Sequence, residues 1–348
     1  MKTKQFITLF VFALAMGAGS VMGQTTVTLH SATGVTIFQG NEFATAVQQA
    51  QAGDTIYLSS GLFTVTSLDI NKRLIIFGVG HSPAQTLATG HTQVNGDIRL
   101  LSGSDQSLIS GIFFAGNIQV GTTAANQVVA NVTIKRCRIG GMLRLTADPH
   151  VANRASNFYI SENIIHNLDG NFTRNHLIRQ NVILNEMRHF SENNFFQNNI
   201  IGRIHNISGS TFTNNVILVL LHSTHLESHM VAINNSIFNN NVFVPNVVFG
   251  ASNQGALTNL INQPLADIFV NFAGQTTFSD EFNFNLKPEF AGNNFGTDGT
   301  DVGIFGTSTP FKANYLPVVP HIKSKTIAPQ TDAAGKLSVQ IEVEAQRN

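Results

Sequence analysis

The amino-acid sequence predicts an all-β solenoid of short strands, and three observations lead to that fold class. First, 37 Asn and 29 Gly residues favour many tight turns. Second, 27 Phe residues in a chain that is 43% hydrophobic favour strands. Third, one short pattern recurs at intervals of 16 to 26 residues, which fits one coil of a solenoid. Only 11% of the 348 residues are charged, so a folded chain is expected rather than a disordered one.

The charge balance excludes some classes of partner. The chain has 20 Lys and Arg against 20 Asp and Glu, and no run of cations. It therefore lacks the electrostatic footprint that nucleic acid or an anionic membrane surface requires. No segment approaches the roughly 20 apolar residues of a membrane-spanning helix.

The N-terminal segment predicts export. Lys2 and Lys4 precede an apolar run at 6–16, and small residues follow at 17–23. This is the pattern of a signal peptide, so we expect residues 1–23 to be cleaved before Gln24. The mature chain is then secreted, periplasmic or held at the cell surface.

The segment after the signal peptide predicts a cap followed by strands. Residues 41–51 form a short amphipathic pattern, with Phe43, Val47 and Ala50 on one side. Strand-like runs follow at 53–58, 61–63 and 74–80. We expect a helix that closes the first coil.

The repeating pattern is an apolar residue followed three positions later by Asn and five positions later by Ile, Val or Phe. Side chains alternate along a strand, so two apolar residues five apart share one side only if the chain bends between them. Asn tolerates left-handed backbone, and stacked Asn side chains can hydrogen-bond to one another. The expected structural ladder is Asn163, Asn181, Asn199, Asn215 and Asn241.

Cys137 occupies the equivalent ladder position one coil before Asn163. As the sole cysteine it allows no internal disulfide. The positive charges of nearby Lys135, Arg136 and Arg138 could lower the pKa of the thiol, which would make it reactive. We favour the alternative, in which Cys137 is a small apolar filler inside the coil.

These coils resemble those of right-handed parallel β-helix proteins of the pectin-lyase-like superfamily, which carry an inward Asn ladder with stacked aliphatic and Phe columns. Residues 297–306 resemble a closing coil, and 320–343 resemble the ends of secreted bacterial members of unassigned function. The resemblance implies a single-stranded right-handed parallel β-helix over 24–312 and a C-terminal extended tail over 313–348, packed on or beside it. We expect a monomer. It implies little about function, because this scaffold hosts lyases, hydrolases, esterases and adhesins.

A catalytic site is hard to assemble from the sequence. Hydrolases of this superfamily use clustered Asp residues, and this chain has no Asp-Asp pair. A lyase needs a base and a positive charge near the uronate carboxylate. The densest candidate is Glu186, Arg188 and His189, near Glu192 and with Arg179, Arg203 and His205 one coil away. The favoured interpretation is a solvated face with ordinary ion pairs.

Glu186 has two possible orientations. Counting from the ladder places it with the apolar residues Met142, Leu168 and Ile204, where burial would raise the pKa of its carboxyl group. A local bulge would instead turn it outward. We favour the bulge.

Metal sites are possible at two places, although no cofactor is expected. In an extended segment His225, Glu227 and His229 share one face and could bind zinc, but loop histidines are usually solvated. Asp298 and Asp301 could bind calcium, but a turn role is favoured.

The column after the ladder should point outward as an apolar stripe: Ile164, Val182, Ile200, Val216 and Val242. Such a stripe marks a contact surface. The alternation of Leu337, Val339, Ile341 and Val343 predicts that the C-terminal tail, residues 315–348, covers it. A partner molecule is the alternative.

Two classes of function follow from these features. The favoured one is a non-catalytic protein that binds an extracellular glycan or another surface, or has a structural role there. Its binding residues would be an exposed polar lattice at Arg179, Gln197, Thr213 and Asn239, although the lack of Trp removes the usual sugar-stacking rings. The alternative is a polysaccharide lyase that acts on a uronate-containing polysaccharide through Glu186, Arg188 and His189.

Overall fold

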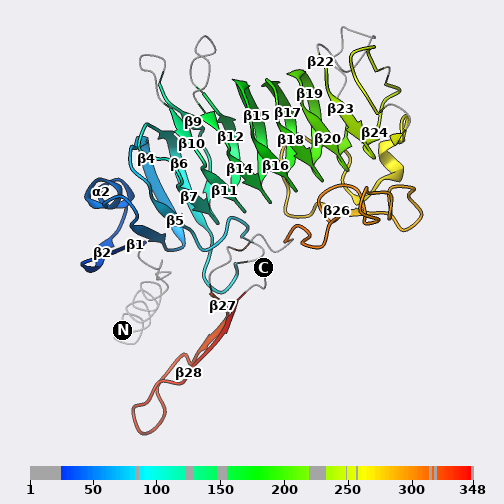
Figure 1. The fold of residues 1–348 in the computed structure, drawn as a ribbon. Coiled ribbons are helices and arrows are strands. Elements are labelled where there is room, and N and C mark those ends of the chain that lie inside the picture. Colours follow the sequence, from blue (N-terminus) through cyan, green and yellow to red (C-terminus); the bar gives the residue numbers. More distant parts are fainter. Residues whose placement is uncertain are drawn as a thin grey trace, which may run out of the picture.

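The chain forms a right-handed parallel β-helix, which confirms the predicted fold class (Figure 1). A computed structural model describes residues 25–83, 86–122, 128–146, 155–218, 233–247, 249–255, 258–312, 316 and 320–345. Within these ranges two long sheets, here called sheet 1 and sheet 2, run along the whole solenoid. The predicted signal peptide lies outside the described residues. None of the described helices is long and apolar enough to span a membrane.

Sheet 1 consists mostly of three-residue strands that pair in parallel, one from each coil. Its N-terminal edge is antiparallel, because β1 pairs with β2 and β3 in that sense. In spatial order its strands are β2 (Gly34–Gln39), β1 (Thr26–Ser31), β3 (Thr55–Leu58), β5 (Ile75–Phe77), β7 (Leu108–Ser110), β11 (Thr133–Lys135), β14 (Tyr159–Ser161), β16 (Leu177–Arg179), β18 (Phe195–Gln197), β20 (Thr211–Thr213) and β23 (Ile237–Asn239).

Sheet 2 contains longer parallel strands with bulges between their two halves. Its strands are β4 (Gly61–Ile70), β6 (Thr92–Leu100), β8 (Phe113–Phe114), β9 (Ile118–Val120), β12 (Arg138–Arg144), β15 (Ile164–Thr173), β17 (Val182–Phe190), β19 (Ile200–Ser208), β21 (Val216–Ile217), β22 (Ile233–Asn234) and β24 (Val242–Phe243). A third, short parallel pair joins β10 (Val129–Ala130) to β13 (Ala155–Ser156).

The first coil is capped by the predicted helix, α2 (Phe43–Gln49), which is shorter than the 41–51 pattern. It buries Phe43, Ala46 and Val47 against the end of the solenoid. Lys72 Nζ donates to the carbonyl of Ala50 at 2.9 Å, which satisfies a carbonyl just after the helix.

The asparagine ladder is present, and its side chains satisfy the backbone at each bend. Asn181 Oδ1 accepts from the backbone N of Asn163 at 3.0 Å and from its Nδ2 at 2.9 Å, and the same pair of bonds repeats along the column. The ladder extends one step further than predicted, to Asn259. The left-handed residues are those just before the ladder positions, at Arg136, Glu162, Gln180, Asn198, Asn214 and Asn240.

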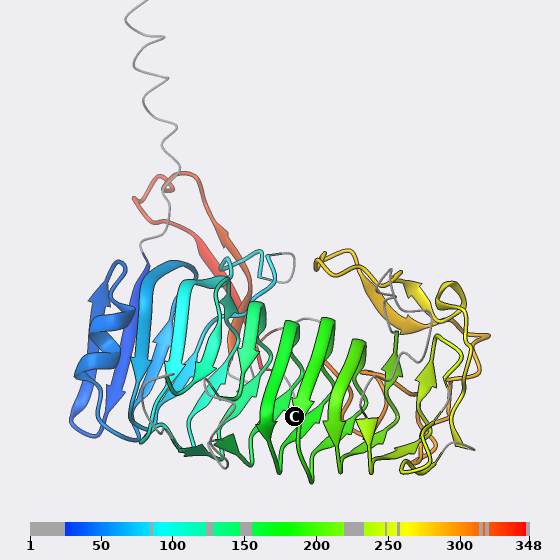
Figure 2. The ribbon, with the colours of Figure 1, turned by 90° about the horizontal axis from the view of Figure 1, so that it is seen from above.

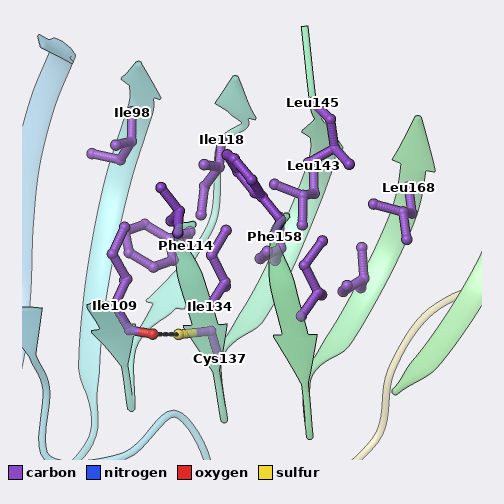
Figure 3. Packing of buried hydrophobic residues seen from close by; sticks show 14 of the residues in the cluster. Ile98, Ile109, Phe114, Ile118, Ile134, Cys137, Leu143, Leu145, Phe158 and Leu168 are labelled. Carbon is purple, nitrogen blue, oxygen red and sulfur yellow. Dashed lines mark hydrogen bonds between the residues drawn. The ribbon is translucent and has the colours of Figure 1, made fainter. Parts of the chain in front are cut away.

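Cys137 is fully buried at its ladder position, and its backbone N donates to Asn163 Oδ1 at 2.9 Å. Desolvation raises the pKa of the thiol to about 12. Its Sγ lies 3.8 Å from the carbonyl oxygen of Ile109, among the aliphatic residues shown in Figure 3. Cys137 is therefore the apolar filler that the sequence favours.

The core is a set of side-chain columns between the sheets (Figure 3). Phe196, Phe212 and Phe238 stack with centroid distances of 4.6 and 4.7 Å, because successive strands of sheet 1 place equivalent residues directly above one another. The resulting cylinder is stiff enough to position side chains on its outer surface.

The apolar stripe is covered, but not by the predicted segment. All five of its residues are buried, and they pack against the described part of residues 265–316, chiefly Ile268, Phe290, Val302 and Ile304. This covering segment includes η2 (Leu265–Asp267) and the antiparallel pair β25 (Phe269–Asn271) and β26 (Asn283–Leu286). Residues 297–306 belong to it, so the expectation of a closing coil there was wrong. Cover by the C-terminal tail was also wrong.

The covering segment continues back along the bends towards the N-terminus. Asn240 Nδ2 donates to Phe295 O at 2.6 Å, and Asn198 Nδ2 donates to Gly303 O at 3.1 Å. Further back, Gln180 Nε2 donates to Thr309 O at 2.5 Å, and Arg136 donates to Leu316 O at 3.3 Å. The segment therefore contacts the coils in the reverse of their order along the chain. Each contact is made by the polar side chain of a left-handed residue that directly precedes a ladder position.

The tail itself forms an antiparallel hairpin of β27 (His321–Ile327) and β28 (Val339–Glu344). The hairpin projects away from the coils (Figures 1 and 2). Val339, Ile341 and Val343 alternate as predicted, yet each is more than half exposed, at 52 to 61%. The division of the chain at residue 312 stays a prediction.

Candidate functional site

Two columns of mostly polar side chains run along the outward surface of sheet 2. Strand register defines them, because a residue on one strand stacks on its parallel partner about 4.8 Å away. The inner core column between them includes Leu143, Leu168, Met187 and Ile204, all buried. The first outward column contains Ser67, Asp97, Asn117, Met142, Asn167, Glu186 and Arg203, and the second contains Asp69, Arg99, Gln119, Arg144, Asp169, Arg188 and His205.

A bulge decides the orientation of Glu186. The register of β15 and β17 shifts between Ile165 and Asn167, so Glu186 pairs with Asn167 and Met187 takes the core position. The favoured bulge is therefore present, and Glu186 is in the outward column. A count of residues from the ladder position aligned Glu186 with the core column, because the count did not allow for the extra residue that the bulge inserts in β17.

Glu186 is the centre of a charged cluster. Its Oε2 accepts from Arg188 NH1 at 2.6 Å. Its Oε1 accepts from Arg203 NH2 and lies 2.5 Å from His205 Nε2. The Glu186 side chain is only 7% exposed, because these three side chains surround it.

The cluster fixes the charge of Glu186. Burial alone would raise the pKa of the carboxyl group, but the hydrogen bond from Arg203 and the charges of His205, Arg188 and Arg203 outweigh it and lower the pKa. Burial lowers the pKa of His205, and Glu186 only partly opposes this effect. Glu186 is therefore ionised at neutral pH, and His205 is mainly neutral.

Asp169 joins the cluster through the other side of Arg188. Its Oδ2 accepts from Arg188 Nε at 3.1 Å, and its Oδ1 lies 3.1 Å from His189 Nδ1. Arg188 thus bridges two carboxylates on neighbouring strands. The three predicted catalytic residues, Glu186, Arg188 and His189, do lie together. Asp169 was not among the predicted site residues, because only the register between β15 and β17 places it beside Arg188.

His189 lies at the rim of the cluster. Its φ is +55°, and its ring contacts that of Phe172 at a centroid distance of 5.3 Å. Phe172 is 53% exposed and also left-handed, with φ at +66°, which is unusual for a bulky residue. An aromatic ring therefore faces solvent beside the charged cluster.

The other end of the same face contains a cavity of about 280 Å³. Arg144 lies on the side nearest the cluster, and Asp97 lies on the far side. The cavity is lined by Ser67, Asp97, Arg99, Asn117, Gln119, Met142 and Arg144. All of these residues belong to the two outward columns.

The predicted polar lattice lies on sheet 1 instead. Arg179, Gln197, Thr213 and Asn239 stack in register, as expected. However, the Arg179 guanidinium lies 3.4 Å from both Thr307 Oγ1 and Thr309 Oγ1, so the covering segment reaches this column. Arg179 is therefore separate from the charged cluster of sheet 2.

The candidate metal sites gain no support. His225, Glu227 and His229 lie outside the described residues. The part of the chain that is described contains no group of three or more His, Cys, Asp or Glu side chains suited to a metal ion. Asp298 accepts from Thr300 Oγ1 at 2.7 Å, and Asp301 accepts from Asn294 N at 2.9 Å, so both carboxylates stabilise turns.

A buried histidine, His176, lies in the turn between β15 and β16 and makes stability depend on pH. His176 Nδ1 lies 3.2 Å from the backbone N of Phe158, which donates to it, so Nε2 carries the proton and donates to Thr173 Oγ1 at 2.9 Å. Burial lowers the pKa of His176 to about 3. Between pH 6.5 and about 3 the unfolded chain binds this proton and the folded chain does not.

We therefore expect the free energy of unfolding to fall as pH decreases through that window. His81, whose pKa burial and the charge of Arg138 also lower to about 3, adds to the effect. Urea unfolding at several pH values should show a smaller slope for His176→Gln than for the wild type. The control His30→Gln, at an exposed position, should leave the slope of the unfolding free energy against pH unaltered. An unchanged slope in His176→Gln would show that His176 does not cause the pH dependence.

Comparison with known proteins adds little. No protein-family model matches the chain, and no curated protein matches it. One similar solved structure is a mutant of the PL6-family alginate lyase AlyGC, with 12% sequence identity and a TM-score of 0.32. The match covers 83% of this chain but only 58% of the lyase chain. At this level of similarity nothing about the enzyme's activity transfers to the present chain.

Proposed function

We propose that the protein binds an extracellular polysaccharide along the outward face of sheet 2. The observation that carries this proposal is the pair of polar columns, which present donors and acceptors from β4 to β19 and include a cavity. An extended polymer can contact such a face repeatedly, because equivalent positions recur about every 4.8 Å.

The chemistry of the face suits sugar hydroxyl groups. Asn167 and Asn185 form one amide pair at 2.9 Å, and Gln119 is a further amide in the second column. Amides and charged groups together provide both donors and acceptors for hydroxyls. Phe172 provides an exposed ring where a sugar can stack, which partly offsets the absence of Trp.

A polysaccharide lyase is the second candidate, and the neutral state of His205 favours it. An imidazole next to Arg188 and Arg203 could accept the proton from C5 of a uronate while a guanidinium stabilises the adjacent carboxylate. Loss of the C4 oxygen substituent would then give an unsaturated sugar. Against this activity, Glu186 already occupies His205 Nε2 and both guanidinium groups.

The test is a binding panel of acidic and neutral polysaccharides, with ultraviolet absorbance recorded to detect an unsaturated product. We expect binding without product, and about tenfold weaker binding for the double variant Gln119→Ala, Asn185→Ala, which corresponds to about 1.4 kcal/mol. Asn239→Leu on sheet 1 is the control. Failure to bind any polysaccharide would refute the proposal. If only Asn239→Leu weakened binding, the binding site would be the sheet 1 lattice instead. If the wild type formed an unsaturated product and Arg188→Ala did not, the protein would be a lyase.

A further inference from the structure

The arginines of the outward face differ in their pairing. Arg99 makes a two-point contact with Asp69, with Nε to Oδ1 at 2.5 Å and NH2 to Oδ2 at 2.9 Å. Arg188 and Arg203 pair with the carboxylates of the charged cluster. Arg144 is the exception: across the described ranges no carboxylate lies within ion-pair distance of it.

Arg144 is also held at the cavity wall. Its NH2 lies 3.2 Å from Met142 Sδ, the side chain two residues earlier that lines the same cavity. A thioether is a weak acceptor, so this contact positions the guanidinium without satisfying its charge. The cavity of about 280 Å³ therefore contains one guanidinium available for an external anion.

The remaining lining is suited to hydroxyl groups. Asp97 Oδ1 accepts from Asn117 N at 2.8 Å and from Asn117 Nδ2 at 3.1 Å, whereas Oδ2 accepts from no donor among the described residues. The strands of Asp97 and Arg144 lie two spacings apart, roughly 9.6 Å, and the two residues belong to different outward columns. A negative group is favoured at Arg144, and hydroxyl donors are favoured at Asp97.

We propose that this cavity is a subsite for an acidic sugar residue, with its carboxylate paired to Arg144 and its hydroxyl groups directed to Asp97. The inference rests on the proposed polysaccharide binding and specifies the class of sugar. A planar guanidinium can bind a carboxylate through two parallel hydrogen bonds. At the charged cluster the same carboxylate would have to displace Glu186 or Asp169, whereas at Arg144 it displaces no carboxylate of the described residues.

The test compares an oligogalacturonate with its methyl ester, in which a methyl group on each carboxyl removes the negative charge. The wild type should bind the acid at least about tenfold more tightly than the ester, and Arg144→Gln should bind the two equally. Arg144→Lys, which keeps the charge but loses the two-point geometry, should retain part of the preference. Lys325→Gln on the exposed hairpin controls for general charge, and circular dichroism checks that each variant is folded.

Three results would overturn the inference, and they separate it from the proposed function. Equal binding of acid and ester by the wild type leaves polysaccharide binding intact but removes the acidic subsite. A preference that survives Arg144→Gln and is lost in Arg203→Gln places the carboxylate at the charged cluster. Binding of no polysaccharide, acidic or neutral, refutes the proposed function and the inference together.

Discussion

Replacing Asn199 with leucine is expected to destabilise the protein by about 3 kcal/mol or more, because several buried polar groups lose their partners at once. Asn199 Oδ1 accepts from the backbone N and the Nδ2 of Asn181, at 2.9 and 3.0 Å. Asn199 Nδ2 donates to the carbonyl of Ile178 and to Asn215 Oδ1, each at 2.9 Å. Leucine can make none of these bonds, and the site is fully buried.

The matched control is Asn239→Leu, the same substitution on the outer surface of sheet 1. The Asn239 side chain is partly exposed, so we expect a change within about 0.5 kcal/mol. Urea unfolding of the wild type and both variants gives the comparison. Equal loss in the two variants would mean that the ladder adds no more to stability than a surface amide.

Replacing Glu186 with glutamine is expected to cost about 2 kcal/mol at neutral pH. The change leaves Arg188 and Arg203 facing each other without their shared negative charge. Removing one partner of a fully buried ion pair costs more than this, but the two arginine side chains are 28 and 29% exposed and retain some solvation. Glu192→Gln, at an exposed position just after the same strand, is the control and should be nearly neutral.

The pH dependence of this difference provides a second check. The pKa of Glu186 is lowered in the folded protein, so its contribution is present above the unfolded pKa of about 4.5 and is lost as pH falls through the folded pKa. The stability of the wild type should therefore approach that of Glu186→Gln in acid. A constant difference down to pH 2 would show that packing, rather than charge, causes the loss.

The sequence was informative where one residue type repeats at one position. The ladder at Asn163 to Asn241 and the helix over Phe43–Gln49 were predictable, because each depends on local pattern and period. The outward stripe was also predictable, since its buried state follows from alternation plus the need for a cover.

The parts that depend on register or on distant segments were not predictable. Asp169 reaches Arg188 only because a bulge shifts β15 against β17, and bulges leave no clear pattern in the residues. The cover was assigned to Val339 and Ile341 for their alternation, but residues such as Phe290 and Ile304, which have no simple period, provide it. Arg144 could not be identified from the sequence, because it differs from the other arginines only in lacking an ion pair among the described residues, and ion pairs are known only from the structure.

The reverse course of the covering segment restricts how this solenoid can change in length. Most solenoids gain or lose a repeat easily, since each unit touches only the next. Here Leu316 is hydrogen-bonded to Arg136, Thr309 to Gln180 and Phe295 to Asn240. The covering segment is therefore attached at fixed points to coils from the end of the solenoid back to an early one. Inserting a coil between Asn181 and Asn241 would move these attachment points apart, and the covering segment would need matching residues to reach them.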